Sequence, residues 1–266
     1  MQDQHAMQLA VVTGASSGIG LELAKIFAGH GFDLLVTAES ERIYDAAVEL
    51  RALGARVDVV RADLATYDGV EKLYATIQGM SRPADVVCIN AGIGSGGPFV
   101  ETELEKELRL IQLNVASAVH LAKRVLQDMH ARNEGRILFT SSVAAEGPAP
   151  FEAVYAASKA FVQSFAEALR NELKETDIVI TALQPGATDT KFFERADMLD
   201  TKVGAGRKSS PADVARQGFE ALMKGKDHVV AAMLKEKAMV AGARVMPETV
   251  NAEMHRKLSE PGSADR

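Results

Sequence analysis

TGASSGIG, residues 13–20, directly follows a short apolar run, QLAVVT (8–13), and opens a helical pattern at Gly18. Gly14 permits a tight turn, Gly18 lets the backbone approach a bound group closely, and Gly20 lets the helix lie near the strand. The exposed amides at the start of such a helix favour a phosphate. This strand–loop–helix unit therefore predicts an α/β fold that binds a nucleotide at the loop.

Three other interpretations of the loop have to be weighed. The first is a P-loop, which is not expected because no Gly-Lys-Ser/Thr follows. The second is a purely structural turn, which stays an alternative because the spacing G-x-x-x-G-x-G differs from the usual dinucleotide-binding pattern G-x-G-x-x-G. Gly14 to Gly18 also fits G-x-S-x-G, the nucleophile elbow of serine hydrolases. Only 13 residues precede Gly14 and no HGGG-like loop lies among them, so we expect no hydrolase.

Beyond the loop, short apolar runs alternate with longer helical patterns along the whole chain. The runs are continuous in Val, Ile and Leu, as expected for strands of a parallel sheet that is covered on both faces. Strands are expected at 8–13, 33–38, 56–62, 84–90, 135–141, 177–184 and 227–233, and helices at about 18–30, 40–53, 67–80, 101–132, 152–175 and 211–224.

This order predicts an α/β fold, a single-domain Rossmann-like doubly wound parallel sheet of about seven strands with helices on both faces. No linker or internal repeat divides the chain, so we expect one dinucleotide-binding and catalytic domain over residues 1–266. Residues 187–210 contain glycines and charges with little periodicity, and they predict a mobile loop over the substrate.

The bulk composition limits the functional classes. The 266 residues are 47% hydrophobic and 25% charged, with a net charge of −6 and a pI of about 5.6, which argues against nucleic acid or an anionic membrane surface as a partner. The N-terminal sequence lacks the pattern of a signal peptide, and the single Cys88 lies in an apolar run, so we expect a cytoplasmic protein. The His residues show no metal-ligand spacing, and no metal is expected.

A second motif, YAASK, places Tyr155 and Lys159 four residues apart in a helical pattern, so both side chains share one face. A free Tyr has a pKa near 10 and is a poor base at neutral pH. A nearby ammonium stabilises the phenolate and lowers that pKa. Tyr155 is therefore predicted to act as a general acid/base that Lys159 tunes, in a reaction that adds or removes a proton at a carbonyl or alcohol oxygen.

With both motifs in place, the chain resembles the classical short-chain dehydrogenase/reductase family. Each matching feature is weak alone, but together they occur in the family's order over nearly the whole chain. They are TGASSGIG, Asp63-Leu64 after the third strand, Asn90-Ala91-Gly92 at the end of the fourth, Asn114 in the following long helix, Ser142 after the fifth strand, Tyr155 and Lys159, and Pro185-Gly186 at the end of the sixth strand.

The resemblance implies an NAD(P)-dependent oxidoreductase that interconverts an alcohol and a ketone or aldehyde by hydride transfer. It implies that Ser142 bonds the substrate oxygen, that Lys159 also bonds the nicotinamide ribose, and that Asn114 bends its helix and holds a water linked to Lys159. The implied catalytic residues are Asn114, Ser142, Tyr155 and Lys159. The implied cofactor-binding residues are Gly14, Ser16, Ser17, Gly18, Ile19, Gly20, Glu39, Asp63, Leu64, Asn90, Ala91, Gly92, Tyr155, Lys159, Pro185, Gly186, Thr188 and Thr190.

The choice between NAD and NADP falls at the end of the second strand, in VTAESER (36–42). An acidic residue there bonds the adenosine ribose of NAD, whereas a basic one accepts the 2′-phosphate of NADP. By resemblance the NAD-type Asp would fall at Ala38 and the NADP-type Arg at Glu39, so neither signature is present. Glu39 would repel a phosphate and favours NAD, unless it turns to solvent and Arg42 reaches the phosphate instead.

The sequence leaves the substrate open. We expect a medium-sized, largely apolar small molecule, bound by residues 93–99, 144–151 and the 187–210 loop, with Phe99, Phe151, Phe192 and Phe193 among its contacts. A non-catalytic dinucleotide-binding or sensor protein on the same fold is the alternative. A nucleotide-sugar epimerase also uses YxxxK, but only about 80 residues follow Pro185, so we expect none.

The resemblance also implies assembly. The helices at 101–132 and 152–175 are expected to pair across a two-fold axis in a homodimer or homotetramer. The residues expected to face outward are Leu121, Val125, Phe161 and Phe165.

Overall fold

One parallel sheet organises the molecule. The computed structural model describes residues 7–243 and 246–264. Within them the sheet has seven strands in the order β3-β2-β1-β4-β5-β6-β7, which confirms the predicted doubly wound architecture. The strands are β1 (Leu9–Thr13), β2 (Asp33–Ala38), β3 (Val57–Arg61), β4 (Val86–Ile89), β5 (Glu134–Thr140), β6 (Asp177–Pro185) and β7 (His228–Ala231).

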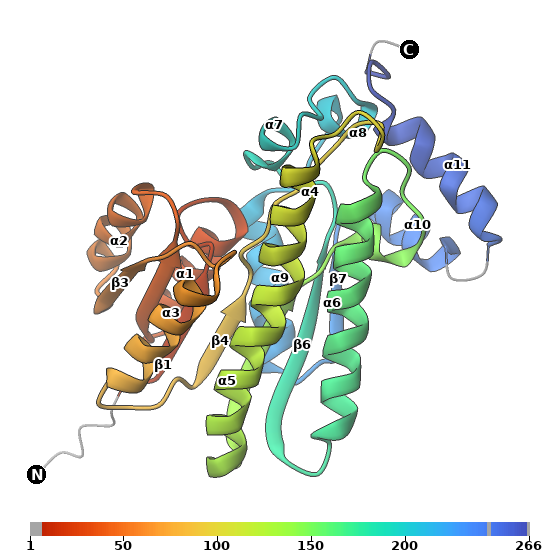
Figure 1. Cartoon of the computed structure of the whole chain (residues 1–266). Helices are drawn as coiled ribbons and strands as arrows, with labels where there is room; N and C mark the ends of the chain where they lie inside the picture. Colours follow the sequence, from red (N-terminus) through yellow and green to blue (C-terminus); the bar gives the residue numbers. More distant parts are fainter. Residues whose placement is uncertain (1–6, 244–245, 265–266) are drawn as a thin grey trace, which may run out of the picture.

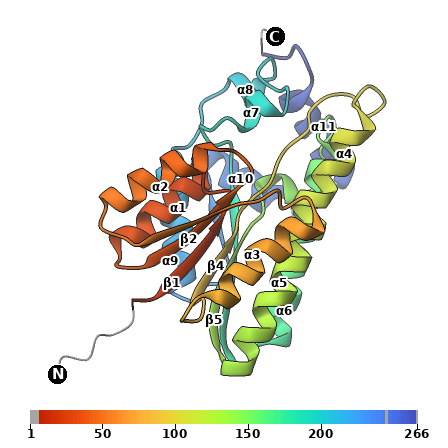
Figure 2. The same ribbon diagram turned by 60° about the vertical axis from the view of Figure 1, so that its left-hand side comes forward.

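Helices cover both faces of this sheet (Figures 1 and 2). One layer contains α1 (Gly18–Gly29), α2 (Arg42–Ala52) and α9 (Pro211–Met223). The opposite layer contains α3 (Tyr67–Gly79), α5 (Ser117–Arg132) and α6 (Ala153–Glu172). The helices expected from the sequence are present, so the period of the apolar pattern locates them correctly.

Strand β1 shows why its sequence is continuously apolar. Leu9 and Val11 belong to the core on one face of the sheet, and Ala10 and Val12 to the core on the other. All four are fully buried because successive side chains of a strand point to opposite faces. The neighbouring strands β2 and β4 flank β1 on its two sides. The crevice at the carboxyl ends of β1 and β4 is thus the place where ligands bind in such sheets.

The helix expected at 101–132 is interrupted. It consists of α4 (Leu104–Ile111), a π-helical turn η1 (Gln112–Ala116) and α5. A π-helical turn inserts an extra residue and often marks a functional site. Asn114 lies in the middle of this turn, so the local distortion expected around it is present.

Two of the four residues expected to face outward do not. Leu121 and Val125 on α5 are buried at 1% and 2% exposure, and they pack against the sheet. Phe165 is half-buried against the same core and stacks on Phe161, which is 40% exposed. The outward apolar side chains lie mainly on α4 instead. They are Leu104, Leu108 and Ile111, which recur on one face of that helix.

The loop and the C-terminal region both contain helices that the sequence pattern did not predict. The 187–210 segment holds α7 (Phe192–Arg195) and α8 (Lys202–Ala205), with a small core of Phe193, Ala196 and Met198. After β7 follow α10 (Leu234–Ala243) and α11 (Glu248–Ser259). Figures 1 and 2 show α7, α8 and α11 gathered at one end of the molecule, beyond the carboxyl ends of the strands.

No helix in the part of the chain that the structure describes combines the length and the apolar character needed to cross a membrane.

Candidate active site

The glycine loop between β1 and α1 has the geometry that its sequence predicts. Gly14 and Gly18 adopt φ angles of +69° and +59°, which side chains with a Cβ rarely tolerate. A Cβ on Gly20 would lie 2.4 Å from the carbonyl oxygen of Gly14, so helix and loop touch. Ser17 precedes α1 without capping it through its side chain, which leaves the first amides of the helix available to a phosphate.

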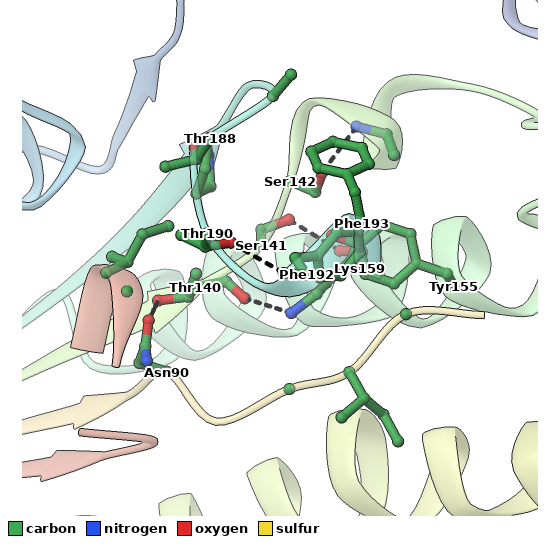
Figure 3. A pocket seen from close by; sticks show the side chains of 18 of the residues that line it. Asn90, Thr140, Ser141, Ser142, Tyr155, Lys159, Thr188, Thr190, Phe192 and Phe193 are labelled. Carbon is green, nitrogen blue, oxygen red and sulfur yellow. Dashed lines mark hydrogen bonds between the residues drawn. The ribbon is translucent and has the colours of Figure 1, made fainter. Parts of the chain in front are cut away.

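Asn90 ties the loop to the two central strands. Its amide nitrogen donates to the carbonyl of Thr13 at 3.0 Å, and its amide oxygen accepts from the hydroxyl of Thr140 at 3.1 Å. The Thr13 hydroxyl in turn accepts from the backbone amides of Asn90 and Ala91, each at 2.9 Å. This network fixes the carboxyl ends of β1, β4 and β5 around the crevice (Figure 3).

At the far end of the crevice, Glu39 and Asp63 meet a cation that the sequence pattern did not identify. The guanidinium of Arg109, on α4, donates to Glu39 at 2.9 Å and to Asp63 at 3.0 Å. Both hydrogen bonds raise the pKa of Arg109, and the bond to Asp63 has the larger effect. Glu39 thus faces Arg109, and in this arrangement Arg42 forms no ion pair among the described residues.

Ser142, Tyr155 and Lys159 come from two elements that meet above β5. Ser142 follows β5 and its hydroxyl accepts from the amide of Ala144 at 3.1 Å. Its neighbour Ser141 instead donates to the carbonyl of Lys159 at 3.0 Å, inside the protein. Of the two serines, Ser142 is therefore the one whose hydroxyl lies beside Tyr155, with which it forms a hydrogen bond.

Burial controls the ionisation of both residues of the YxxxK motif. It raises the pKa of Tyr155, an effect that a hydrogen bond with Ser142 opposes and the charge of Glu152 reinforces. Burial also lowers the pKa of Lys159, to about 8. The ammonium of Lys159 donates to the carbonyl of Thr140 at 2.9 Å (Figure 3). Among the described residues the hydrogen bond with Ser142 lowers the pKa of Tyr155, whereas the lowering that we expected from Lys159 is not found.

Asn114 is a buried amide whose side chain holds three elements together. Its oxygen accepts from the amide of Ile93 at 3.0 Å, and its nitrogen donates to the Ile93 carbonyl at 2.9 Å and to the Ser158 hydroxyl at 3.0 Å. Its oxygen and the ammonium of Lys159 approach the same face of Gly92, where an added Cβ would lie 3.1 Å and 3.2 Å from them. The π-helical turn thus brings Asn114 beside Lys159.

The segment after β6 closes the site from above. The hydroxyl of Thr188 donates to the carbonyl of Gly186 at 2.8 Å, and that of Thr190 accepts from the amide of Phe192 at 3.2 Å. The ring of Phe192 lies 5.1 Å from that of Tyr155, centroid to centroid. Phe192 also covers Gly94, where an added Cβ would lie only 2.4 Å from the ring. Phe192 therefore lies directly over the candidate catalytic residue.

A single cavity of about 760 Å³ joins these parts. Every residue predicted to be catalytic or to bind the cofactor lines it except Asn114, which lies behind Gly92. The described residues contain no group of His, Cys, Asp or Glu side chains able to hold a metal ion. The residues expected to bind cofactor that line the cavity are Gly14, Ser16, Ser17, Gly18, Ile19, Gly20, Glu39, Asp63, Leu64, Asn90, Ala91, Gly92, Tyr155, Lys159, Pro185, Gly186, Thr188 and Thr190.

The substrate end of the cavity differs from the sequence-based expectation. Phe192 and Phe193 line it, but Phe99 is 61% exposed and Phe151 contacts Arg256 outside the lining. The C-terminal helices supply much of the wall, and their apolar side chains at 250, 254 and 258 form a helical stripe that could have revealed α11. Among the lining residues that sequence analysis missed are Glu152, Glu236, Met239, Val240, Asn251, Met254, His255, Leu258 and Ser259.

Comparison with known proteins identifies the family. The family model for short chain dehydrogenases matches residues 8–199. A short chain dehydrogenase of the fungus Pseudocercospora fijiensis is 31% identical over 75% of this chain and 66% of its own length, so this chain spans just under two thirds of that relative. The oxidoreductase YmfI of Bacillus subtilis is 30% identical over 77% of this chain and 87% of its own. The chain belongs to the short-chain dehydrogenase family.

Solved structures agree with this assignment. A short-chain dehydrogenase from Sphingobium yanoikuyae in complex with NADPH is 27% identical, covers 90% of this chain and 94% of its own, and has a TM-score of 0.80. One from Burkholderia phymatum in complex with NAD is 25% identical, covers 96% and 97%, and has a TM-score of 0.83. The family is one of oxidoreductases, and a nicotinamide dinucleotide fits the glycine-lined crevice of this chain.

Proposed function

We propose that the protein is an NAD(P)-dependent oxidoreductase that interconverts an alcohol and a ketone or aldehyde, with Tyr155 as general acid/base. The observation that carries the proposal is the convergence of Ser142, Tyr155 and Lys159 on the same cavity as the glycine loop. A sensor protein would need the loop but not this trio. Their shared cavity supports chemistry beside the cofactor.

The dinucleotide would lie along the crevice, between the adenine end at Glu39 and Asp63 and the reactive end at Tyr155. The loop glycines leave the space that a pyrophosphate needs, and the first amides of α1 would bond it. Leu64 and Gly92 would flank adenine and ribose, and Thr188 and Thr190 would face the nicotinamide end. When bound, the cofactor supplies or takes up the hydride.

Tyr155 would deliver a proton to the carbonyl oxygen during reduction and remove one from the hydroxyl during oxidation. Burial favours the protonated phenol, which suits the donating direction. Ser142 would bond the same substrate oxygen. Its hydrogen bond to Tyr155 lowers the pKa of the phenol, so it also favours proton acceptance in the reverse direction.

Lys159 and Asn114 would support Tyr155. With its pKa lowered to about 8, Lys159 can gain or lose a proton near neutral pH, so it can restore the proton that Tyr155 exchanges. Asn114 would position Lys159 through its bonds to Ile93 and Ser158, one residue before that lysine. A water near Asn114 would complete the path to solvent, as the family resemblance implies.

We propose NAD as the preferred cofactor. The carboxylate of Glu39 lies at the adenosine end and would repel a 2′-phosphate, and Ser17 in the loop is uncharged. Arg109 partly offsets this charge, since it is shared between Glu39 and Asp63. Arg61, which also lines the cavity, is paired with Glu41, so the two carboxylates that share Arg109 support NAD over NADP.

The proposal includes a homodimer or homotetramer in the cytoplasm, with residues 187–210 as a mobile substrate loop on one domain. Leu104, Leu108 and Ile111 on α4 and Phe161 on α6 offer exposed apolar surface to a second copy. The partner of chemical interest is a small molecule, not nucleic acid or membrane, as the acidic composition indicates. Light scattering that gives a monomer at micromolar concentration would contradict the assembly.

The function is tested by fluorescence titration with NADH and NADPH, followed by a panel of aldehydes and ketones monitored at the nicotinamide absorbance. Binding of a reduced cofactor with its oxidation by at least one carbonyl compound supports the proposal. Binding without turnover of any compound, or of the matching alcohols with the oxidised cofactors, would favour the sensor.

A further inference from the structure

The feature that the proposed chemistry does not use is the carboxyl group of Glu152. This residue lies immediately before α6 and three positions before Tyr155, and its side chain lines the same cavity. It is only 6% exposed. A buried carboxylate without partners is costly, because the group loses water and gains nothing in return. Proteins therefore tend to give such groups a partner.

Glu152 has no such partner in the described part of the chain. Its backbone joins the local turn, with its amide donating to Ala149 at 3.1 Å and its carbonyl accepting from Ala156 at 2.8 Å, but its side chain does not cap α6. No side chain or backbone amide in the described ranges hydrogen-bonds or ion-pairs with its carboxyl group. Loss of solvent alone raises the pKa of Glu152, to about 7.

Other carboxyl groups of the cavity contrast with Glu152. Glu236 accepts from the amides of Ala187 at 2.8 Å and Met233 at 2.9 Å. Glu39 and Asp63 both bind Arg109. These carboxyl groups form hydrogen bonds within the protein, whereas the carboxyl group of Glu152 can accept a hydrogen bond from a ligand that binds in the cavity beside Tyr155.

The remaining walls indicate what the ligand looks like. The apolar part of the cavity lining includes Val143, Pro148, Phe192, Met239, Met254 and Leu258. The charged side chains Lys191 and Arg195 lie at the exposed rim. On the α11 side, the Nδ1 atom of His255 is also buried, with no hydrogen-bond partner among the described residues. The cavity thus suits an apolar body with a few polar groups at fixed places.

From this arrangement, and resting on the proposed oxidoreductase function, we propose that Glu152 is a substrate-binding residue. It accepts a hydrogen bond from a donor group, a hydroxyl or an amine, that the substrate carries in addition to its reacting carbonyl or carbinol. The preferred substrate class is then an apolar hydroxy- or amino-ketone and the corresponding diol or amino alcohol. A substrate with a carboxylate at that place is disfavoured by charge repulsion.

The test uses matched ketones that differ only in the donor. We choose 3′- and 4′-hydroxyacetophenone against 3′- and 4′-methylacetophenone, and 2-hydroxyacetophenone against propiophenone. The 4′-aminomethyl compound adds a cationic donor and 4-acetylbenzoate adds an anion. For each pair the ratio of kcat/KM is compared between wild type, Glu152→Leu and Glu152→Gln, so that inherent differences in reactivity between the two ketones cancel.

We expect wild type to prefer the donor-bearing member of at least one pair. Glu152→Leu should reduce that preference by about 10- to 100-fold, the loss expected for one hydrogen bond to a charged group. Glu152→Gln should retain part of the preference. A stronger response of the aminomethyl ketone would identify the donor as an ammonium, and a stronger response of a phenol would identify a hydroxyl.

The control is Glu172→Gln, at the solvent-exposed end of the same helix, which should change none of the ratios. Two outcomes would overturn the inference. One is that wild type has the same kcat/KM for both members of every pair, and the other is that Glu152→Leu lowers kcat/KM equally for both members. Thermal unfolding of each variant checks that the fold is intact.

A separate measurement distinguishes failure of this inference from failure of the proposed function. Calorimetric binding of the same probes to protein saturated with NAD⁺ or NADP⁺ requires no turnover. Selective binding of a donor-bearing probe that Glu152→Leu abolishes would support the role of Glu152 even if no ketone is reduced. No binding preference, including no binding at all, would overturn it, whatever the outcome for catalysis.

Discussion

The ammonium of Lys159 lies 5.9 Å from the ring centre of Tyr155 while it donates its hydrogen bond to the carbonyl of Thr140 at 2.9 Å. The cation therefore approaches the ring and is anchored to the end of β5. Because both side chains are removed from water, burial raises the pKa of the phenol and lowers that of the amine. These shifts favour the protonated form of Tyr155, which is the form that can donate a proton.

The glycine loop offers a test with a built-in control on one helix. In Gly20→Ala the added methyl group would collide with Gly14 and with the amide of Asn90, at 2.4 Å and 2.6 Å. Cofactor affinity should fall by at least tenfold, together with the unfolding temperature. Gly29→Ala meets no atom within 4 Å, so it should be neutral or stabilise by about 0.5–1 kcal/mol. Equal effects of the two variants on the Kd of the reduced cofactor would refute the close-contact role of Gly20.

The cofactor preference depends on the charge at Glu39. Glu39→Arg replaces a carboxylate with a guanidinium, frees Arg109 from one of its two partners and leaves a positive corner for the 2′-phosphate. We expect wild type to bind NADH more tightly than NADPH. The variant should shift the ratio of the two Kd values toward NADPH by tenfold or more, because the interaction between two charges at short range amounts to about a few kcal/mol.

Fluorescence titration measures both constants. Glu49→Arg, on the exposed face of α2, controls for the change in net charge. A tenfold wild-type preference for NADPH, or a Glu39→Arg variant whose ratio does not move, would contradict the role of Glu39.

Glu152 makes stability depend on pH in a definite direction. Burial raises its pKa from the ordinary 4.5 to about 7, so the folded protein favours the protonated acid. Its contribution to stability is fully present below about pH 4.5 and is lost as the pH rises through 7. Glu152→Gln carries no charge and escapes this loss, so its advantage over wild type should grow by on the order of 3 kcal/mol between pH 5 and pH 8.

Urea unfolding at the two pH values measures this difference, with Glu172→Gln, at the exposed end of the same helix, as the matched control. The same variant should also ease ionisation of Tyr155, because the negative charge of Glu152 raises the pKa of that phenol. Alcohol oxidation by Glu152→Gln is then expected to begin at lower pH than in wild type. A stability difference that is the same at both pH values would show that Glu152 is not a buried acid.

Local patterns were enough to locate the sheet and most of the site. The continuous apolar runs predicted all seven strands, because residues such as Leu9 and Ala10 must bury side chains on opposite faces. The glycines of the loop and the four-residue spacing of Tyr155 and Lys159 are constraints on neighbouring residues. Such constraints are legible in the sequence, and the structure brings these motifs to one cavity.

Features that depend on distant contacts were not predictable in this way. Arg109 and Glu39 are 70 positions apart in the sequence, and no local pattern around either residue predicts that they form an ion pair. Leu121 and Val125 face the sheet because the π-helical turn at Asn114 sets the rotation of α5 relative to α4. The C-terminal helices supply part of the cavity wall around the site, and their position is a property of the whole fold.

The central claim, that Tyr155 exchanges the proton, is tested most directly by Tyr155→Phe. The variant keeps the ring that contacts Phe192 and removes only the hydroxyl. Measured on a ketone that wild type reduces, kcat should fall by about 10²- to 10⁴-fold, while the Kd of the reduced cofactor stays within about threefold. Tyr44→Phe, on the exposed surface of α2, should leave both values unchanged. A Tyr155→Phe enzyme that retains more than about a tenth of wild-type turnover would contradict the account.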